Sequence, residues 1–237
     1  MRSQLKKALN WAGGAFSIAG IIFVILRLRD YGGELDGSRF GSGAWVVLAA
    51  LALVYGLANV MLGLAWWNLL QKFGCNITQR WAVKTYGVSQ LAKYVPGNIF
   101  HLAGRQAIGM AADLPAGPLA KSAVWELGLI SGTGLLFGVL AIPLSLLVPD
   151  VVGMFALIFC VGVTISVLLR YDGPALARTF GWYVGFLAIS GALFVAIVGV
   201  LVATESSGVG VPWLQLWGAY VLAWMAGLVT PGAPAGV

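Results

Sequence analysis

The fold is decided by an uncharged run of 32 residues, "FGSGAWVVLAALALVYGLANVMLGLAWWNLLQ", which extends from Phe40 to Gln71. A helix needs about 20 predominantly apolar residues to cross the ~30 Å hydrocarbon core of a bilayer, and this run is longer than that. It shows no period-two alternation of apolar and polar residues, which is the pattern of a membrane β-barrel strand. The run therefore predicts a transmembrane helix.

The composition of the whole chain points the same way. Hydrophobic residues make up 60% of the 237 residues and charged residues only 9%, whereas about a quarter of a soluble domain is charged. We therefore predict an all-α polytopic membrane protein that forms a single transmembrane domain (1–237). About six spans are expected, near residues 8–28, 43–70, 118–147, 151–170, 181–203 and 211–230.

The distribution of positive charge predicts the orientation. With a cytoplasmic N-terminus and six alternating spans, 11 Lys and Arg residues lie inside and 3 outside, which together make the 14 of the chain. Cytoplasmic loops carry such an excess of Lys and Arg. The net charge of +6 is then explained by these loops and their attraction to anionic lipid heads. We expect membrane lipids as partners and no nucleic acid.

One stretch departs from this pattern. Residues 80–105 overlap the stretch "LAKYVPGNIFHLAGRQ" (Leu91–Gln106), in which Lys93 and Pro96-Gly97 interrupt an apolar sequence. If this stretch crossed the bilayer, the inside would hold 7 Lys and Arg residues and the outside 5, a much poorer asymmetry. Irregular backbone survives at membrane depth only where protein or a water-filled cavity surrounds it. We expect a re-entrant or interfacial helical hairpin around 80–105 that turns at Pro96-Gly97.

Polar side chains follow helical spacing on both sides of this turn. Tyr86, Ser89, Gln90 and Lys93 form one stripe before it, and Asn98, His101 and Arg105 form a second stripe after it. Helix N-termini near the turn would direct their positive dipole ends at an anion. The pattern predicts a binding site for an anionic head group. The alternative is that the two cations only extend to the lipid heads and that the histidine packs in the interior.

Glu126 completes the predicted site. It lies about one and a half turns into the span that begins near Pro118, and a carboxylate at that depth is costly unless it is paired. Lys121 is on a different helical face, so Arg105 or Lys93 is the expected partner. A carboxylate that extends to the membrane surface is the alternative. The predicted head-group-binding residues are Lys93, Asn98, His101, Arg105 and Glu126.

Motifs for enzymatic and metal chemistry are missing from the sequence. The chain has one histidine and two cysteines far apart, Cys75 and Cys160, and it carries no zinc-ligand spacing, phosphate-binding glycine loop or hydrolase motif. We predict no catalytic residue, no metal and no cofactor. An enzyme would need a general base, for which Glu126, Asp113 and His101 are the candidates.

The order of these elements resembles a known family. Pro96-Gly97 is followed eight residues later by Arg105, then by "LPAGPLAKS", a span that opens with Glu126, and a second Pro-Gly at Pro231-Gly232. This order is similar to the transmembrane region of lysylphosphatidylglycerol synthases, a flippase-like family of bacterial integral membrane proteins. The resemblance covers roughly residues 40–237. It differs in that Leu127 follows the glutamate, where the family often has arginine, and in lacking the aminoacyl-transferase domain. In the family the second Pro-Gly usually leads into further helices, so the resemblance implies that this chain is truncated at its C-terminal end.

The resemblance implies a location and a function. The location is the bacterial inner membrane. The function is that of a translocase for a phospholipid or a polyprenyl-phosphate-linked glycolipid, with both Pro-Gly pairs, Pro96-Gly97 and Pro231-Gly232, as structural helix breaks. Two alternatives stay open: a membrane-embedded transferase, and a non-transporting subunit of a lipid or glycan synthesis complex. In that complex a glycosyltransferase or a lipid-synthesis enzyme would be the partner.

Overall fold

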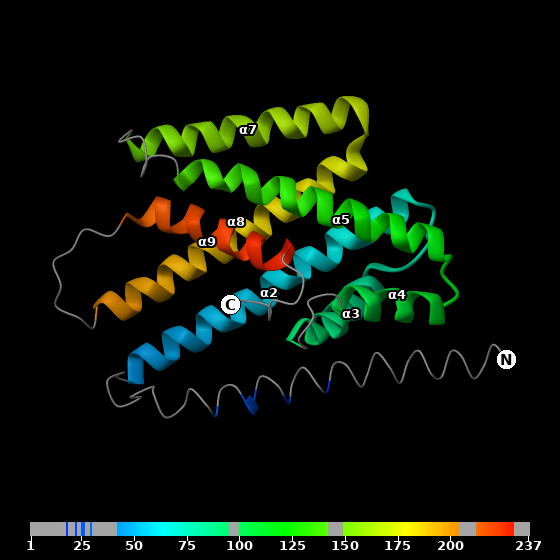
Figure 1. Cartoon of the computed structure of the whole chain (residues 1–237), viewed down its shortest axis with the longest axis horizontal. Helices are drawn as coiled ribbons and strands as arrows, with labels where there is room; N and C mark the ends of the chain where they lie inside the picture. The colour runs from blue at the N-terminus through cyan, green and yellow to red at the C-terminus, as the bar shows by residue number, and fades with distance from the viewer. Residues whose placement is uncertain are drawn as a thin grey trace. The chain divides into compact units, whose positions relative to one another are not determined.

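A computed structural model describes residues 42–94, 100–141, 149–203 and 212–229, and five isolated positions between 18 and 29. Within these ranges the regular structure is helical throughout (Figure 1), so the predicted all-α class is confirmed. Most of the first predicted span, near 8–28, lies outside the described residues. The same holds for five predicted site residues, Pro96, Gly97, Asn98, Pro231 and Gly232.

In the ranges that the structure describes, four helical segments are long and apolar enough to cross a membrane. This establishes an integral membrane protein with helical spans. The predicted spans near 43–70, 118–147 and 151–170 correspond to the first three of these segments. The segments are α2 (Ser42–Lys72), α5 (Ala116–Phe137) with its short extension η3 (Gly138–Ala141), α7 (Asp150–Tyr171) and α8 (Pro174–Ala203).

The fourth segment begins earlier than the predicted boundary at residue 181. Gly173 has a φ of +86° and follows the last turn of α7, where its N–H donates to the carbonyl of Leu168. Pro174 is then the first residue of α8, a position where the missing proline N–H leaves no hydrogen bond unmade. Arg178, which precedes the predicted boundary, therefore lies on the helix.

The last predicted span, near 211–230, corresponds to α9 (Trp213–Val229), which has 17 residues. At 1.5 Å per residue it is about 26 Å long, somewhat shorter than the hydrocarbon core. The described part of this predicted span is therefore slightly too short to cross the hydrocarbon core without tilt.

The segment around 80–105 forms a hairpin. It consists of α3 (Gln79–Gln90), a short turn of 3-10 helix, η2 (Leu91–Tyr94), and α4 (Phe100–Ala111). The two α-helices have 12 residues each, about 18 Å, which is too short to cross a bilayer. They lie side by side (Figure 1). The hairpin form of the prediction is confirmed, and a single continuous span over this segment is excluded; its depth in the membrane stays a prediction.

The chain divides into two compact units. Helices α2 and α5 each contribute residues to both units. The hairpin unit contains the second part of α2, the α3–α4 hairpin and the first part of α5. The bundle unit contains the first part of α2, the rest of α5, α7, α8 and most of α9. Their bounds are 1–35, 62–128 and 226–237 for the hairpin unit, and 36–61 and 129–225 for the bundle unit.

In the hairpin unit, Trp66 joins three helices. Its side chain is fully buried, its ring stacks on Trp81 of α3 with 6.0 Å between centroids, and its Nε1–H donates to Ser122 Oγ of α5 at 3.1 Å. Gly63, one turn earlier on α2, allows the close approach: a Cβ there would lie 2.9 Å from the Cα of Val83. The missing side chain therefore sets the distance between α2 and α3.

In the bundle unit, small residues bring η3, the short extension of α5, against α9. A Cβ at Gly138 would lie 2.9 Å from Leu222, and one at Gly218 would lie 2.8 Å from the backbone nitrogen of Ala141. Close backbone approach at glycine is a common basis of helix packing in membranes, where no hydrophobic effect drives the helices together.

Large apolar side chains face outward on the spans. Leu53 of α2 is 72% exposed and Phe159 of α7 is 71% exposed. Conversely, polar side chains such as Thr85 and Ser122 are buried. This distribution suits lipid as the surrounding medium, because lipid solvates apolar side chains and leaves backbone and polar groups unsatisfied.

The close contact at Gly63 predicts that alanine substitutions at two glycines of α2 differ in their effect on stability. Gly63→Ala should lower the free energy of unfolding in detergent by about 1–3 kcal/mol, because the added methyl group forces α2 and α3 apart. Gly56→Ala is the matched control, since a Cβ there meets nothing within 4 Å among the described residues. Thermal unfolding of both variants measures the effect. Equal melting temperatures would contradict the packing described here.

Candidate functional site

The candidate site is an ion pair between α4 and α5. Two contacts hold these helices together one turn away: Gln106 Nε2–H donates to the carbonyl of Leu119 at 3.1 Å, and Gly109 lets the Leu119 side chain approach closely. Arg105 Nη1 and Nη2 then donate to Glu126 Oε1 at 3.1 Å and Oε2 at 2.5 Å. The pair is bidentate, the strongest and most directional form of such a contact. Of the two partners that the sequence analysis expected for Glu126, Arg105 and Lys93, the structure therefore shows Arg105.

Two aromatic residues complete the surroundings of this pair. Tyr86 O–H of α3 donates to Glu126 Oε1 at 2.9 Å. The Arg105 guanidinium carbon lies 4.5 Å from the centroid of the Tyr86 ring and 5.0 Å from that of Trp66, close enough for cation–π attraction. We call Trp66, Tyr86, Arg105 and Glu126 the arginine cluster; it draws one residue from each of α2, α3, α4 and α5.

Burial distinguishes between the alternatives that the sequence left open. The Arg105 side chain is 0% exposed and that of Glu126 is 6% exposed, so neither extends to the membrane surface. For these two residues, the alternative that the side chain extends to the membrane surface is therefore wrong. Lipid or a dry protein interior tolerates such charges only when they are paired, and the bidentate contact supplies that pairing.

The electrostatics keep Arg105 charged. Burial by itself lowers the pKa of Arg105, but the negative charge of Glu126 more than offsets it and holds that pKa above its usual value. Burial and the same carboxylate raise the pKa of Tyr86, so its hydroxyl remains a hydrogen-bond donor. The cluster thus combines one cation, one anion and one neutral donor.

His101 lies one turn before Arg105 on α4 and is 5% exposed. Burial, together with the charges of Arg105 and Lys93, lowers the pKa of His101 to about 3, so the ring is neutral at pH 7. Among the described residues, its Nδ1 and the Nε of Arg105 have no hydrogen-bond partner. Buried polar atoms are rarely left without one. The site therefore has hydrogen-bonding capacity that the described side chains do not use.

Lys93 lies on η2, between the two helices of the hairpin, and is half-buried. Burial lowers its pKa to about 8, which leaves the ammonium largely charged at pH 7. Because its charge acts on His101, the structure brings Lys93, His101, Arg105 and Glu126 together. Asn98, the fifth predicted binding residue, lies outside the described part of the chain.

Sequence reasoning did not identify the aromatic walls of the site. Tyr86 was placed on the polar stripe of α3 but was not named as a site residue, and Trp66 was not considered. An aromatic residue inside an apolar span carries no pattern that separates a cation–π partner from ordinary packing. The polar spacing of Tyr86 with Ser89 was the one available signal.

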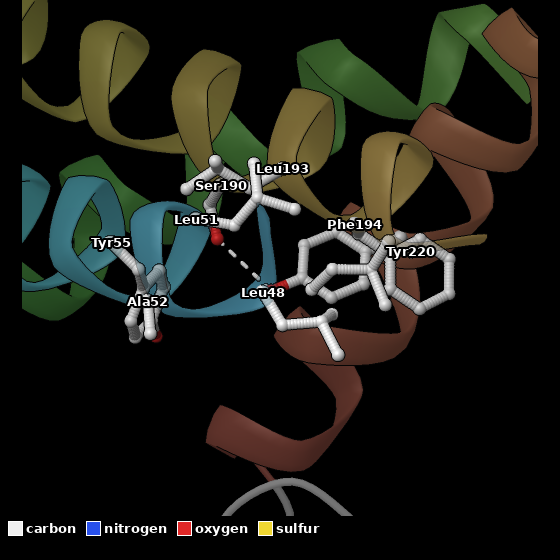
Figure 2. Close-up of a pocket in the computed structure, with 9 residues that line it drawn as sticks. Leu48, Leu51, Ala52, Tyr55, Ser190, Leu193, Phe194 and Tyr220 are labelled. Atoms are coloured by element: carbon white, nitrogen blue, oxygen red, sulfur yellow. Dashed lines mark hydrogen bonds between the residues drawn. The ribbon is translucent and has the colours of Figure 1, made fainter. Parts of the chain in front are cut away.

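A separate pocket lies in the bundle unit between α2, α8 and α9 (Figure 2). Its volume is about 280 Å³, and aliphatic and aromatic side chains line most of it. The sequence analysis did not anticipate it. In the described ranges, no group of three or more His, Cys, Asp or Glu residues is placed to hold a metal ion.

Comparisons with known proteins found no matching family model, curated protein or solved structure. The function is therefore argued from the site.

The ion pair predicts a non-additive effect on stability. Glu126→Leu should cost about 3–5 kcal/mol, because it leaves the Arg105 charge buried and unpaired. The double variant Arg105→Met with Glu126→Leu should recover most of that loss, since an apolar pair of similar volume needs no charge compensation. Thermal unfolding in detergent of both single variants and the double variant measures this coupling. A double variant as unstable as the sum of the two single variants would contradict a pairwise interaction.

His101 lies outside the four candidate spans, and its shifted pKa predicts that the free energy of unfolding depends on pH. Its pKa of about 3 in the folded protein is below the ordinary value of ~6.5 expected after unfolding. Between these values the unfolded chain binds more protons, so the free energy of unfolding falls as the pH is lowered. His101→Gln lacks this proton uptake. Lowering the pH from 7.5 to 5 should therefore reduce the melting temperature of the wild type more than that of the variant.

Proposed function

We propose that this integral membrane protein is a flippase-like translocase, which binds the phosphate of a phospholipid or of a polyprenyl-phosphate-linked glycolipid and moves it across the membrane. The observation that carries the proposal is the buried arginine cluster. Arg105 is fully buried with its charge intact. Beside it, Arg105 Nε and His101 Nδ1 have no partner among the described residues.

The hydrogen-bonding groups of the site are complementary to a phosphate. Guanidinium groups bind phosphate and carboxylate oxygens in the same forked geometry, so a phosphate can compete with Glu126 for Arg105. The Nε–H of Arg105 offers a further donor, and the charge of Lys93 acts on the same place. The first turn of α4, which begins at Phe100, adds the positive end of a helix dipole.

The exchange between Glu126 and a phosphate suits transport rather than tight capture. The phosphate gains a charge-assisted bidentate pair with Arg105, while Glu126 loses its own and keeps only the hydrogen bond from Tyr86. Because an unpaired buried carboxylate is costly, the net free energy of binding is small compared with either pair alone. A transport site must bind strongly enough to load and weakly enough to release. Glu126 holds Arg105 paired when no substrate is bound, which avoids an isolated buried charge.

The hairpin also buries several of its polar side chains. Ser89, His101 and Arg105 are buried, while Val88 and Met110 are 38% and 40% exposed. These buried polar groups support a shielded polar path for a head group. The resemblance to the lysylphosphatidylglycerol synthase region supports the same function. With it we propose the bacterial inner membrane, a cytoplasmic N-terminus, and a glycosyltransferase or lipid-synthesis enzyme as a partner.

The test is lipid translocation by the full chain in reconstituted vesicles. Fluorescent phosphatidylglycerol in the outer leaflet is chemically quenched over time, which reports the transbilayer rate. Arg105→Ala and Glu126→Gln should each lower this rate by about tenfold or more, the effect of losing a charge-assisted hydrogen bond. Lys84→Ala is the matched control, because Lys84 is an exposed cation on the same hairpin and should leave the rate unchanged.

Lys93→Gln separates binding from folding, because it leaves the Arg105–Glu126 pair intact. It should raise the lipid concentration that gives half the maximal rate and leave the melting temperature near that of the wild type. Transport that is the same in the wild type, Arg105→Ala and Glu126→Gln would remove these residues from the mechanism and refute the proposed site.

A further inference from the structure

The negative charge of Glu126 is compensated by Arg105. Glu126 is 4% exposed, and its hydrogen-bond partners among the described residues are Arg105 and the Tyr86 hydroxyl. Arg105 donates to both carboxylate oxygens, whereas the hydroxyl donates to Oε1. When a phosphate takes the place of Glu126 at Arg105, Oε2 therefore loses its donor, and the carboxylate loses its cation in a buried position.

The helices around Glu126 carry further cations, but these are exposed. Trp66 of α2 and Tyr86 of α3, which adjoin the ion pair, are uncharged at pH 7. In the described ranges, no cation other than Arg105 lies within ion-pair distance of the carboxylate. The exposed cations of α2, α3 and α5 are Lys72, Arg80, Lys84 and Lys121.

The charge of Lys93 acts on a different part of the cluster. Burial, Arg105 and Lys93 lower the pKa of His101. Burial and the Glu126 carboxylate raise the pKa of Tyr86, and Arg105 lowers it, without a contribution from Lys93. Since Tyr86 bonds directly to Glu126, Lys93 acts on the His101 side of the cluster rather than on the carboxylate side.

A proton restores the charge balance of the loaded site. Without substrate, Arg105 and Glu126 cancel each other's charge. The phosphate of a phosphodiester adds one negative charge, which is costly in a buried position. A buried carboxylate that lacks a cation becomes neutral by binding a proton. We propose that Glu126 binds one proton each time a phosphate displaces it from Arg105, so that an anionic lipid head group and a proton move together.

This inference rests on the proposed transport function and names its energy source. The proton forms an O–H bond at a Glu126 oxygen when the phosphate binds, and it returns to water when Arg105 pairs with Glu126 again. The empty and the loaded ion-pair site then carry the same net charge. A membrane potential does work only on net charge that is moved. A pH gradient therefore drives the transport, and the potential does not.

The first test counts the protons taken up when the full chain in detergent binds short-chain phosphatidylglycerol. The phosphodiester of this probe keeps one negative charge from pH 5.5 to 7, and Lys93, with a pKa of about 8, is largely charged there. Calorimetry in two buffers with different ionisation enthalpies gives the number of protons. We expect about one proton per lipid, and an affinity that falls by up to about tenfold for each unit of rising pH, as proton linkage requires.

Variants show which group takes up the proton. Glu126→Gln should bind the lipid without proton uptake, because an amide does not ionise, whereas Glu126→Asp keeps a carboxylate and should keep the uptake. His101→Gln should also keep it, since the ring has a pKa of about 3 and stays neutral in this pH range. Lys84→Ala removes an exposed cation of α3; it is the matched control and should behave as the wild type. Melting temperatures of all variants show that they are folded.

The second test uses vesicles that contain labelled phosphatidylglycerol. An imposed pH gradient should enrich the labelled lipid in the leaflet that faces the higher pH. A potassium diffusion potential of equal free energy should leave its distribution unchanged, whereas an anion that crossed without a proton would respond to it.

The outcomes separate this inference from the proposed function. A wild type that neither binds nor moves phosphatidylglycerol would refute the transport function itself. A wild type that moves the lipid without proton uptake, or in response to the potential rather than the pH gradient, would overturn the proton coupling alone. Uptake that persists in Glu126→Gln, or that is lost in His101→Gln, would assign the proton to another group and overturn it as well.

Discussion

The hairpin unit depends on one constraint: the positive charge of Arg105 is buried without contact to solvent. A buried ion costs several kcal/mol unless it is paired, and Arg105 is 0% exposed. Its compensation comes from the Glu126 carboxylate and from the faces of Tyr86 and Trp66. Because these groups belong to four different helices, the charge is satisfied only when all four meet in one register. One side chain thus specifies how the short hairpin packs against α2 and α5.

The medium explains why such a charge is inside at all. Lipid does not drive apolar side chains inward, so Leu53 and Phe159 remain exposed, while glycine contacts and hydrogen bonds hold the helices together. Polar groups are instead the ones that must find partners within the protein. The Trp66–Ser122 and Ser190–Tyr220 hydrogen bonds are examples of this in the two units.

The sequence predicted those features that follow from length and charge. The spans at α2, α5 and α7 followed from uncharged runs, and a cationic partner for Glu126, either Arg105 or Lys93, followed from the cost of a carboxylate at that depth. The helix α8 begins before the predicted span boundary at residue 181, because Gly173 and Pro174 already form the turn. The pocket could not be predicted, because Leu48, Ser190 and Tyr220 come from three helices and share no spacing.

Stability alone does not account for the arginine cluster. An apolar pair of similar volume is often as stable as a buried ion pair or more stable, so a fold without function would gain little by enclosing Arg105 and Glu126. Arg105 Nε and His101 Nδ1, which have no hydrogen-bond partner among the described residues, point the same way, since a purely structural network satisfies its members. The proposed exchange of the carboxylate for a phosphate would use both features: the carboxylate preserves the charge when no ligand is bound, and these two atoms receive the ligand.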